Sequence, residues 1–214
     1  MPRKMRAFNV FPTEVGLFNK PTIINNVETL EAIPHIVTKG GQFFKKSGPP
    51  KLLSLTGSIE RPVIFETHAG ELTLNDVIKK IKAREITSAE VGGATEPILT
   101  PNKFDTKIGF GKGTLNAVGS IVLFDSNINL ADIYDNKLHF MNEESCKQCV
   151  PCRDGSKILL KSFKDYRSKS SYPDEKLMNI SADSISETSI CAHGKAIGPL
   201  YKEAMKFLKE NYNK

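Results

Sequence analysis

The sequence predicts an α+β protein in which a small sheet-containing domain precedes a group of helices. Two features of the 214-residue chain support this fold class. Short runs rich in β-branched and aromatic residues, separated by Gly and Pro, fill residues 51–128. From residue 129 onward the apolar residues recur at helical spacing, and short loops join the helical stretches.

Residues 1–50 form a segment of their own that contains one helix candidate. An asparagine-rich turn opens the stretch PTIINNVETLEAIPHIVTKGGQFFKK, and a short helix is expected to begin near Val27. Gly40 and Gly41 are expected to end that helix. The sequence SGPP at 47–50 marks the boundary with the next domain.

Residues 51–128 are predicted to run in the order strand, strand, helix, strand, strand. The first two strand candidates are KLLSLTGSI and VIFETHAG, and the later extended pieces are EITSAEVGGA, PILTP and AVGSIVLFD. Between them, Thr73 is expected to cap the helix LNDVIKKIKA, because a threonine oxygen can accept a free N–H of the first turn. This order is typical of a small α+β domain.

Residues 129–214 are predicted to form a bundle of four helices joined by short loops. The helix candidates are LADIYDNKLHFMNEES, SKILLKSFKDYRSK, DEKLMNISADSIS and AIGPLYKEAMKFLKEN. Pro199 is expected near the start of the last helix, where its missing N–H costs least.

Composition and charge argue against two classes of partner. The chain is 39% apolar and 25% charged, and it has no apolar run near the ~20 residues of a membrane span. Its formal net charge is +6, but the lysines are spread along the chain. A nucleic-acid site needs a clustered basic stripe with interleaved aromatic residues, which is not found. We therefore expect neither membrane insertion nor nucleic-acid binding.

The opening stretch MPRKMRAFNVFPTEVG lacks the apolar core of a secretory signal. We therefore expect a reducing compartment, which is the cytoplasm or, as part of a complex, a membrane surface. The stretch is basic and has no acidic residue before Glu14, so it also allows an organelle-targeting reading, as in a mitochondrion-type organelle. In a reducing compartment, clustered cysteines more often bind metal or carry out redox chemistry than form disulfides.

The cysteines are the most informative feature of the chain. Cys146, Cys149 and Cys152 form C-x-x-C-x-x-C, and Cys191 follows 39 residues later in TSICAHG. Thiolates three residues apart can converge from a helical turn or a tight loop, and a fourth from a separate segment can close the site. Ligation of an iron–sulfur cluster by four cysteines has this character.

Two alternatives to an iron–sulfur cluster stay open. Structural zinc sites usually pair two C-x-x-C knuckles, which a triple plus a single cysteine matches less well. Redox thiols of the thioredoxin kind are also less suited, because the third cysteine has no role there. The bacterial ferredoxin run is absent, since Ser156 stands where its fourth cysteine would be. Lys147, Arg153 and Lys157 either tune such a site or are solvated surface charges.

Several segments together resemble one family, the NADH-binding flavoprotein subunit of respiratory complex I and of NAD-linked hydrogenases and formate dehydrogenases. The segment ESCKQCVPCRDG resembles its E-S-C-x-x-C-x-P-C-R-x-G motif, and SICAHG its later [ST]-x-C-A-x-G segment. The stretch PTIINNVETLEAIPHIV resembles its P-T-x-x-N-N-V-E-T segment. KLLSLTGSIERP resembles the opening of its SLBB domain, a β-grasp-like module. The matches occur in the family's order and correspond to the C-terminal half of that protein.

The resemblance implies a 4Fe–4S cluster held by Cys146, Cys149, Cys152 and Cys191. It also implies that Asn25 and Asn26 lie against FMN, although Asn favours turns and helix caps on its own. The domains implied are an N-terminal flavin-facing segment (1–50), an SLBB domain (51–128) and a helical iron–sulfur domain (129–214).

The family's glycine-rich flavin and nucleotide site has no counterpart in the sequence. IGFGKG at 108–113 is predicted to be a turn rather than a phosphate loop, because a strand and not a helix follows it. Any FMN would therefore be shared with a domain that is not in this sequence. Lys147 stands where the family often has Gly.

The resemblance implies an electron-transfer module of an NADH:acceptor oxidoreductase complex. Its partners would be a flavin/NADH-binding domain or chain and other iron–sulfur subunits. No side chain is predicted to act as a general acid or base, and the chain is not expected to oxidise NADH alone. The alternative function is a non-catalytic assembly or partner-binding module with a structural metal site.

Overall fold

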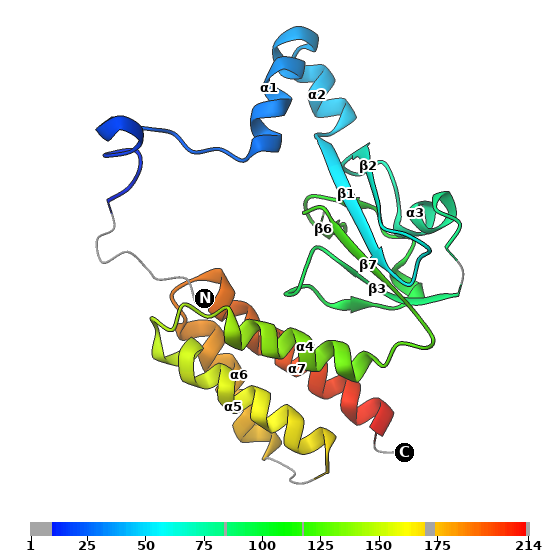
Figure 1. Cartoon of the computed structure of the whole chain (residues 1–214), viewed down its shortest axis with the longest axis vertical. Helices are drawn as coiled ribbons and strands as arrows, with labels where there is room; N and C mark the ends of the chain where they lie inside the picture. The colour runs from blue at the N-terminus through cyan, green and yellow to red at the C-terminus, as the bar shows by residue number, and fades with distance from the viewer. Residues whose placement is uncertain (1–9, 84, 117, 170–173, 213–214) are drawn as a thin grey trace. The chain divides into compact units, whose positions relative to one another are not determined.

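The computed structural model describes residues 10–83, 85–116, 118–169 and 174–212 (Figure 1). It contains helices and antiparallel and parallel strands, so the α+β class is confirmed. The chain forms two compact units: a sheet unit of Arg6–Gly92 and Ile98–Asp125, and a helical unit that contains Gly93–Pro97 and Ser126–Lys214. Residues 1–9, which carry most of the basic stretch with the organelle-targeting reading, lie outside the described residues.

The sheet unit is built on a five-stranded sheet in the order β2-β1-β7-β3-β4. Its strands are β1 (Pro50–Gly57), β2 (Val63–His68), β3 (Ile86–Val91), β4 (Ile98–Leu99) and β7 (Ser120–Asp125). β1 pairs antiparallel with β2 but parallel with β7, which in turn pairs antiparallel with β3. The last strand of the unit therefore lies between the first and the third.

One helix, α3 (Leu74–Lys80), packs on this sheet, and Thr73 caps it as predicted. The Thr73 hydroxyl accepts the N–H of Asp76 at 3.1 Å, and the Asp76 carboxylate accepts the N–H of Thr73 at 2.9 Å. This reciprocal capping box holds the pKa of Asp76 below its usual range through the backbone N–H and the hydroxyl of Thr73. The core under the helix is apolar and comprises Leu53, Leu55, Leu74, Val77, Ala89, Val91, Phe104, Ile108, Ile121 and Leu123.

The glycine-rich segment 108–113 is a turn, as predicted. It runs from β5 (Ile108–Gly109) towards β6 (Leu115–Asn116), and these two short strands form a second, two-stranded sheet. The segment that follows the turn is thus a strand and not a helix.

The N-terminal segment forms a helical hairpin of α1 (Val27–Lys39) and α2 (Gly41–Ser47), after the short helix η1 (Leu17–Asn19). The helix predicted from Val27 to Gly40 is confirmed, because Asn26 caps its start and Gly40 ends it at a φ of 84°. α1 contacts β1 through a charged pair, in which Lys51 donates from Nζ to Glu28. Glu28 also accepts the N–H of Leu52 at 3.3 Å. The Lys51 ammonium is the main cause that holds the pKa of Glu28 below its usual range.

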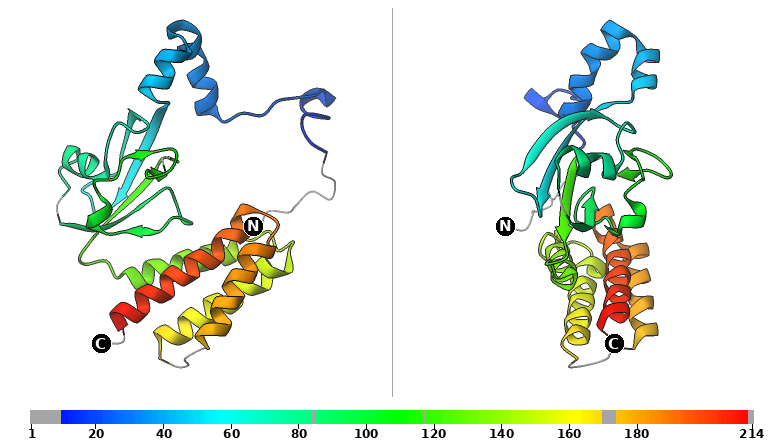
Figure 2. Two further views of the ribbon diagram at one scale, coloured as in Figure 1. Left: turned by 180° about the vertical axis from the view of Figure 1, so that it is seen from behind. Right: turned by 90° about the vertical axis from the view of Figure 1, so that its right-hand side faces the viewer.

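The helical unit contains four helices at the four predicted places (Figure 2). They are α4 (Leu130–Glu143), α5 (Val150–Arg167), α6 (Glu175–Thr188) and α7 (Ala192–Tyr212). α7 packs against α4, α5 and α6, and α5 packs against α4 and α6. Their shared interior contains Leu138, Met141, Leu159, Phe163, Ile185, Ile197, Leu200, Tyr201 and Leu208. Among the described residues, no helix has the length and apolar character needed to cross a bilayer.

The prediction that Pro199 lies near a helix start is wrong. α7 begins at Ala192, so Pro199 falls inside the helix. Gly194 and Gly198 make the preceding stretch look like a loop, yet both serve close packing. A Cβ at Gly198 would lie 2.2 Å from the carbonyl oxygen of Ala182 on α6. The helix therefore extends back to the cysteine that precedes it.

Gly57 provides a test of the parallel pairing between β1 and β7. Its φ is 98°, and a Cβ there would lie 2.1 Å from the carbonyl oxygen of Leu123. We expect Gly57→Ala to lower the free energy of unfolding by about 3 kcal/mol or more, because left-handed strain and a backbone clash add together. Gly113→Ala is the matched control: its φ is 81° and nothing lies within 4 Å of the added Cβ. It should cost only about 1–2 kcal/mol. Urea unfolding followed by circular dichroism measures both, and equal losses would contradict the close approach.

Candidate metal centre

The structure brings the four predicted cysteines together at one end of the helical unit. Cys146 lies in the loop after α4, Cys149 precedes the first residue of α5, and Cys152 lies in the first turn of that helix. Cys191 directly precedes α7. All four are free thiols; Cys152 is buried and Cys191 is exposed.

The mutual influence of the thiols shows their closeness. Burial is the main cause that raises the pKa of Cys152, and negative charge on Cys149, Cys191 and Cys146 raises it further. The pKa of Cys149 is lowered, chiefly because the backbone N–H of Ile190 donates to its sulfur. Since Ile190 is next to Cys191, the segment before α7 lies against the start of α5.

Two helix N-termini meet at this site. The first N–H groups of an α-helix have no partner within the helix and carry partial positive charge. Such positions favour the thiolate form of cysteine, which is the form that binds metal. The beginnings of α5 and α7 thus suit a group that carries negative charge.

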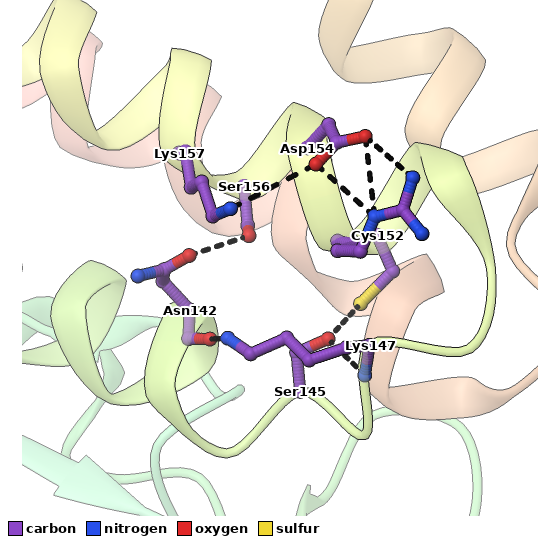
Figure 3. Close-up of polar contacts among 8 residues, drawn as sticks. Asn142, Ser145, Lys147, Cys152, Asp154, Ser156 and Lys157 are labelled. Atoms are coloured by element: carbon purple, nitrogen blue, oxygen red, sulfur yellow. Dashed lines mark hydrogen bonds and ion pairs between the residues drawn. The ribbon is translucent and has the colours of Figure 1, made fainter. Parts of the chain in front are cut away.

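A hydrogen-bonded loop connects α4 to α5 across the site (Figure 3). Ser145 is fully buried, and its Oγ lies 3.2 Å from the Sγ of Cys152. The backbone N–H of Lys147 donates to the same Oγ at 3.2 Å. Lys147 has a φ of 63°, the left-handed region that favours Gly, and its Nζ donates to the carbonyl of Asn142 at 2.5 Å. Asn142 in turn accepts from Ser156 at 2.9 Å.

The neighbouring cations and histidines have partners away from the sulfurs. Arg153 donates from Nη2 to Asp154 at 2.9 Å, and the Nζ of Lys157 lies 3.8 Å from the same carboxylate (Figure 3). The Arg153 guanidinium is the main cause that holds the pKa of Asp154 below its usual range. His193 Nε2 lies 2.9 Å from the carbonyl of Met141, and His139 pairs with a glutamate one turn along α4. These contacts fit a structural role for both histidines.

The packing around the sulfurs leaves no room for a larger residue. A Cβ at Gly194 would lie 2.5 Å from the Oγ of Ser189 and 3.2 Å from the Cβ of Cys152. Ser189 is itself 3% exposed, and its Oγ has no hydrogen-bond partner among the described residues. Close backbone approach and an unsatisfied buried hydroxyl are what a site prepared for a further group would contain.

The donor set fits an iron–sulfur cluster better than a single ion. Among the described residues, no group of three or more His, Cys, Asp or Glu side chains is arranged to hold one metal ion. A zinc ion requires four sulfurs at about 2.3 Å. A cluster offers each thiolate its own iron, so it accepts cysteines that are neighbours without being crowded onto one point.

The asparagines of the N-N-V-E-T segment lie in the sheet unit. Asn26 accepts the N–H of Glu28 at 2.9 Å and thereby caps α1. Asn25 is exposed. The structure thus shows the capping role that Asn favours on its own, while a flavin contact for either residue stays a prediction.

Two buried contributors to the site were not predicted. Ser145 and Ser189 both lie against the sulfurs, but in sequence they are ordinary serines beside cysteines. Their position next to ligand candidates is the one signal that could have pointed to them. Burial and contact with a particular sulfur follow from the packing of α5 and α7.

Comparison with known proteins identifies relatives of this chain. Residues 132–214 match the NADH-ubiquinone oxidoreductase-F iron–sulfur binding region. The chain is 30% identical to the F-type NADH-quinone oxidoreductase protein of Mycobacterium tuberculosis (strain ATCC 25618 / H37Rv), over 94% of its own length and 48% of that protein. It is 33% identical to the alpha chain of the NAD-reducing hydrogenase HoxS of Cupriavidus necator, over 68% of its own length and 25% of that protein.

A solved structure has the same fold. The crystal structure of an NAD+-reducing [NiFe]-hydrogenase in the H2-reduced state matches with a TM-score of 0.77 at 24% identity. The match covers 98% of this chain and 36% of that one. The chain thus spans about half or less of the length of the relatives it matches.

Gly194 tests the site. We expect Gly194→Ala to weaken iron retention about 10-fold or more after anaerobic loading, because the added Cβ displaces Ser189 and Cys152. Iron and sulfide per chain, measured after gel filtration, give the result. Gly155→Ala is the matched control, since its Cβ would meet only the end of the flexible Ile185 side chain. Equal retention by the Gly194 variant and the unmodified chain would contradict the close packing.

Proposed function

Because residues 132–214 belong to the NADH-ubiquinone oxidoreductase-F iron–sulfur binding region, we propose that this chain is an electron-transfer module. Electrons would reach it from a reduced flavin that has taken hydride from NADH, and leave it for clusters in partner chains. The observation that carries the proposal is the meeting of four free cysteines from two distant segments at the starts of α5 and α7.

We assign the four ligands of the 4Fe–4S cluster to Cys146, Cys149, Cys152 and Cys191. When bound, the cluster supplies one-electron chemistry. The protein's part is to hold the four thiolates, to place helix N-termini against their negative charge and to bury Cys152. No described side chain at the site is required as a general acid or base, so residues here position and tune rather than react.

We propose domains that follow the two compact units. The sheet with its single helix α3 supports an SLBB-type, β-grasp-like domain at residues 51–128. The mutual packing of α4, α5, α6 and α7 supports a four-helix bundle at residues 129–214. Residues 1–50 would then be the segment that faces the flavin.

The N-terminal segment supports a partner that carries the flavin. Between residues 10 and 43 a dense series of apolar side chains is exposed, which is unusual for a surface that stays in contact with water. They are Val10, Phe11, Val15, Leu17, Phe18, Ile23, Ile24, Val27, Leu30, Ile33, Val37 and Phe43. Asn25 and Asn26 lie within this series, next to Ile24 and Val27.

We propose that a flavin/NADH-binding domain or chain covers this surface and brings FMN to the two asparagines. Other iron–sulfur subunits would receive the electrons, in a complex placed in the cytoplasm or at a membrane surface.

Anaerobic reconstitution with iron and sulfide tests the cluster. We expect about four irons per chain and an EPR signal after reduction with dithionite, because four cysteines suffice for one 4Fe–4S cluster. Cys191→Ser should lose most of that iron, while Ser184→Ala, at an exposed position on α6, should keep it. Zinc in place of iron after exposure to both metals would contradict the assignment.

Turnover tests the division of labour. We expect the loaded chain, given NADH, free FMN and ferricyanide, to show negligible NADH oxidation, because the flavin and nucleotide site would lie in the partner. Chemical reduction of the same sample must still produce the EPR signal, so that an inactive preparation is not mistaken for the result. NADH oxidation at enzymatic rates by this chain alone would refute the proposed role.

A further inference from the structure

We propose that two buried serine hydroxyls, those of Ser145 and Ser189, donate hydrogen bonds to the sulfurs of Cys152 and Cys149 and thereby raise the reduction potential of the site. The inference rests on the proposed function, since it requires a cluster on these cysteines. It assigns to two serines a role as tuning residues that act through the ligands.

The contact of Ser145 with Cys152 fixes which atom donates. The Oγ of Ser145 lies 3.2 Å from the Sγ of Cys152, and the residue is 0% exposed. A metal-bound cysteine is a thiolate and has no proton to give. The hydroxyl must therefore be the donor, and its burial leaves no competing water.

The backbone of Lys147 holds that hydroxyl in place. Its N–H donates to the Oγ of Ser145 at 3.2 Å, which occupies the oxygen's acceptor side and leaves the O–H for the sulfur. This geometry requires the left-handed backbone of Lys147, at a φ of 63°. Its Nζ secures the turn by donating to the carbonyl of Asn142 at 2.5 Å. An unfavourable conformation is thus retained where it directs a hydrogen bond.

Ser189 offers an independent observation of the same kind. Its Oγ is buried and has no hydrogen-bond partner among the described residues, which ordinarily costs about 1–3 kcal/mol. The side chain lies beside the thiol of Cys149, and Gly194 permits that position because any Cβ would collide with it. A sulfur that carries negative charge would supply the missing acceptor.

The two serines serve the sulfurs crosswise. Ser145 precedes Cys146 but contacts Cys152, and Ser189 lies two residues before Cys191 but lies beside Cys149. Reduction adds one electron and no proton, and both hydroxyl protons stay on their serines. Hydrogen bonds to the sulfurs stabilise the added negative charge, so they favour the reduced form and raise the potential.

Redox titration of the reconstituted full chain, followed by EPR, tests the proposal. We expect Ser145→Ala and Ser189→Ala each to lower the midpoint potential, and the double variant to lower it further. Ser145→Thr keeps a hydroxyl and should restore the midpoint towards that of the unmodified chain. Ser156→Ala is the matched control, because Ser156 is also buried, on α5, but donates to Asn142 and not to a sulfur. Its midpoint should not change.

The outcomes separate this inference from the proposed function. Midpoints of Ser145→Ala and Ser189→Ala that equal the Ser156→Ala value, in samples with full iron content, would overturn the inference and leave the cluster assignment intact. Failure of the unmodified chain to hold iron would overturn the proposed function instead. If Ser145→Ala does not retain iron, the comparison of Ser189→Ala with Ser156→Ala still decides, and an unchanged midpoint there would count against the hydroxyls.

Discussion

The helical unit depends on one constraint: the start of α5 has to lie close to the start of α7, although 39 residues separate Cys152 from Cys191. Two glycines of α7 make this approach possible. Gly194 leaves space for Ser189 and Cys152, and Gly198 meets the backbone of α6. A side chain at either position would push helices apart. The four thiols can meet because α7 approaches its neighbours without an intervening Cβ.

The two units use their apolar residues differently. The sheet and α3 bury a continuous core, and so do the four helices, whereas α1 buries only Ala32. A capped helix start at Asn26 and the contact of Glu28 with Lys51 give α1 its place beside β1, but they cover little apolar surface. Local order in this segment is thus supported by polar contacts, while the hydrophobic contribution that normally stabilises a helical hairpin is missing. Such a surface is consistent with assembly onto a partner.

Local signals in the sequence predicted much of this structure. Thr73 and Gly40 marked helix ends, and the cysteine spacing identified the site, because caps and ligand motifs act over a few residues. The parallel pairing of β1 with β7 could not be predicted, since it joins strands more than 60 residues apart and leaves no local trace. Pro199 misled because Gly194 and Gly198 have the same appearance in a tightly packed helix as in a loop. Lys147 stood out against the resemblance, and only its φ of 63° explains why Gly is suited to that position.

The division of the ligands between two segments has a mechanical consequence. Bound at all four cysteines, a cluster would act as an internal cross-link that closes the loop from Cys152 to Cys191, a loop that contains α6. By the loop-closure model for cross-links, closing 39 residues restricts the unfolded chain by about 4 kcal/mol. That is comparable with a large part of the stability of an ordinary domain. Oxidative loss of iron would therefore remove a structural tether along with the electron carrier, and the lifetime of the fold would become coupled to the oxygen exposure of the cell.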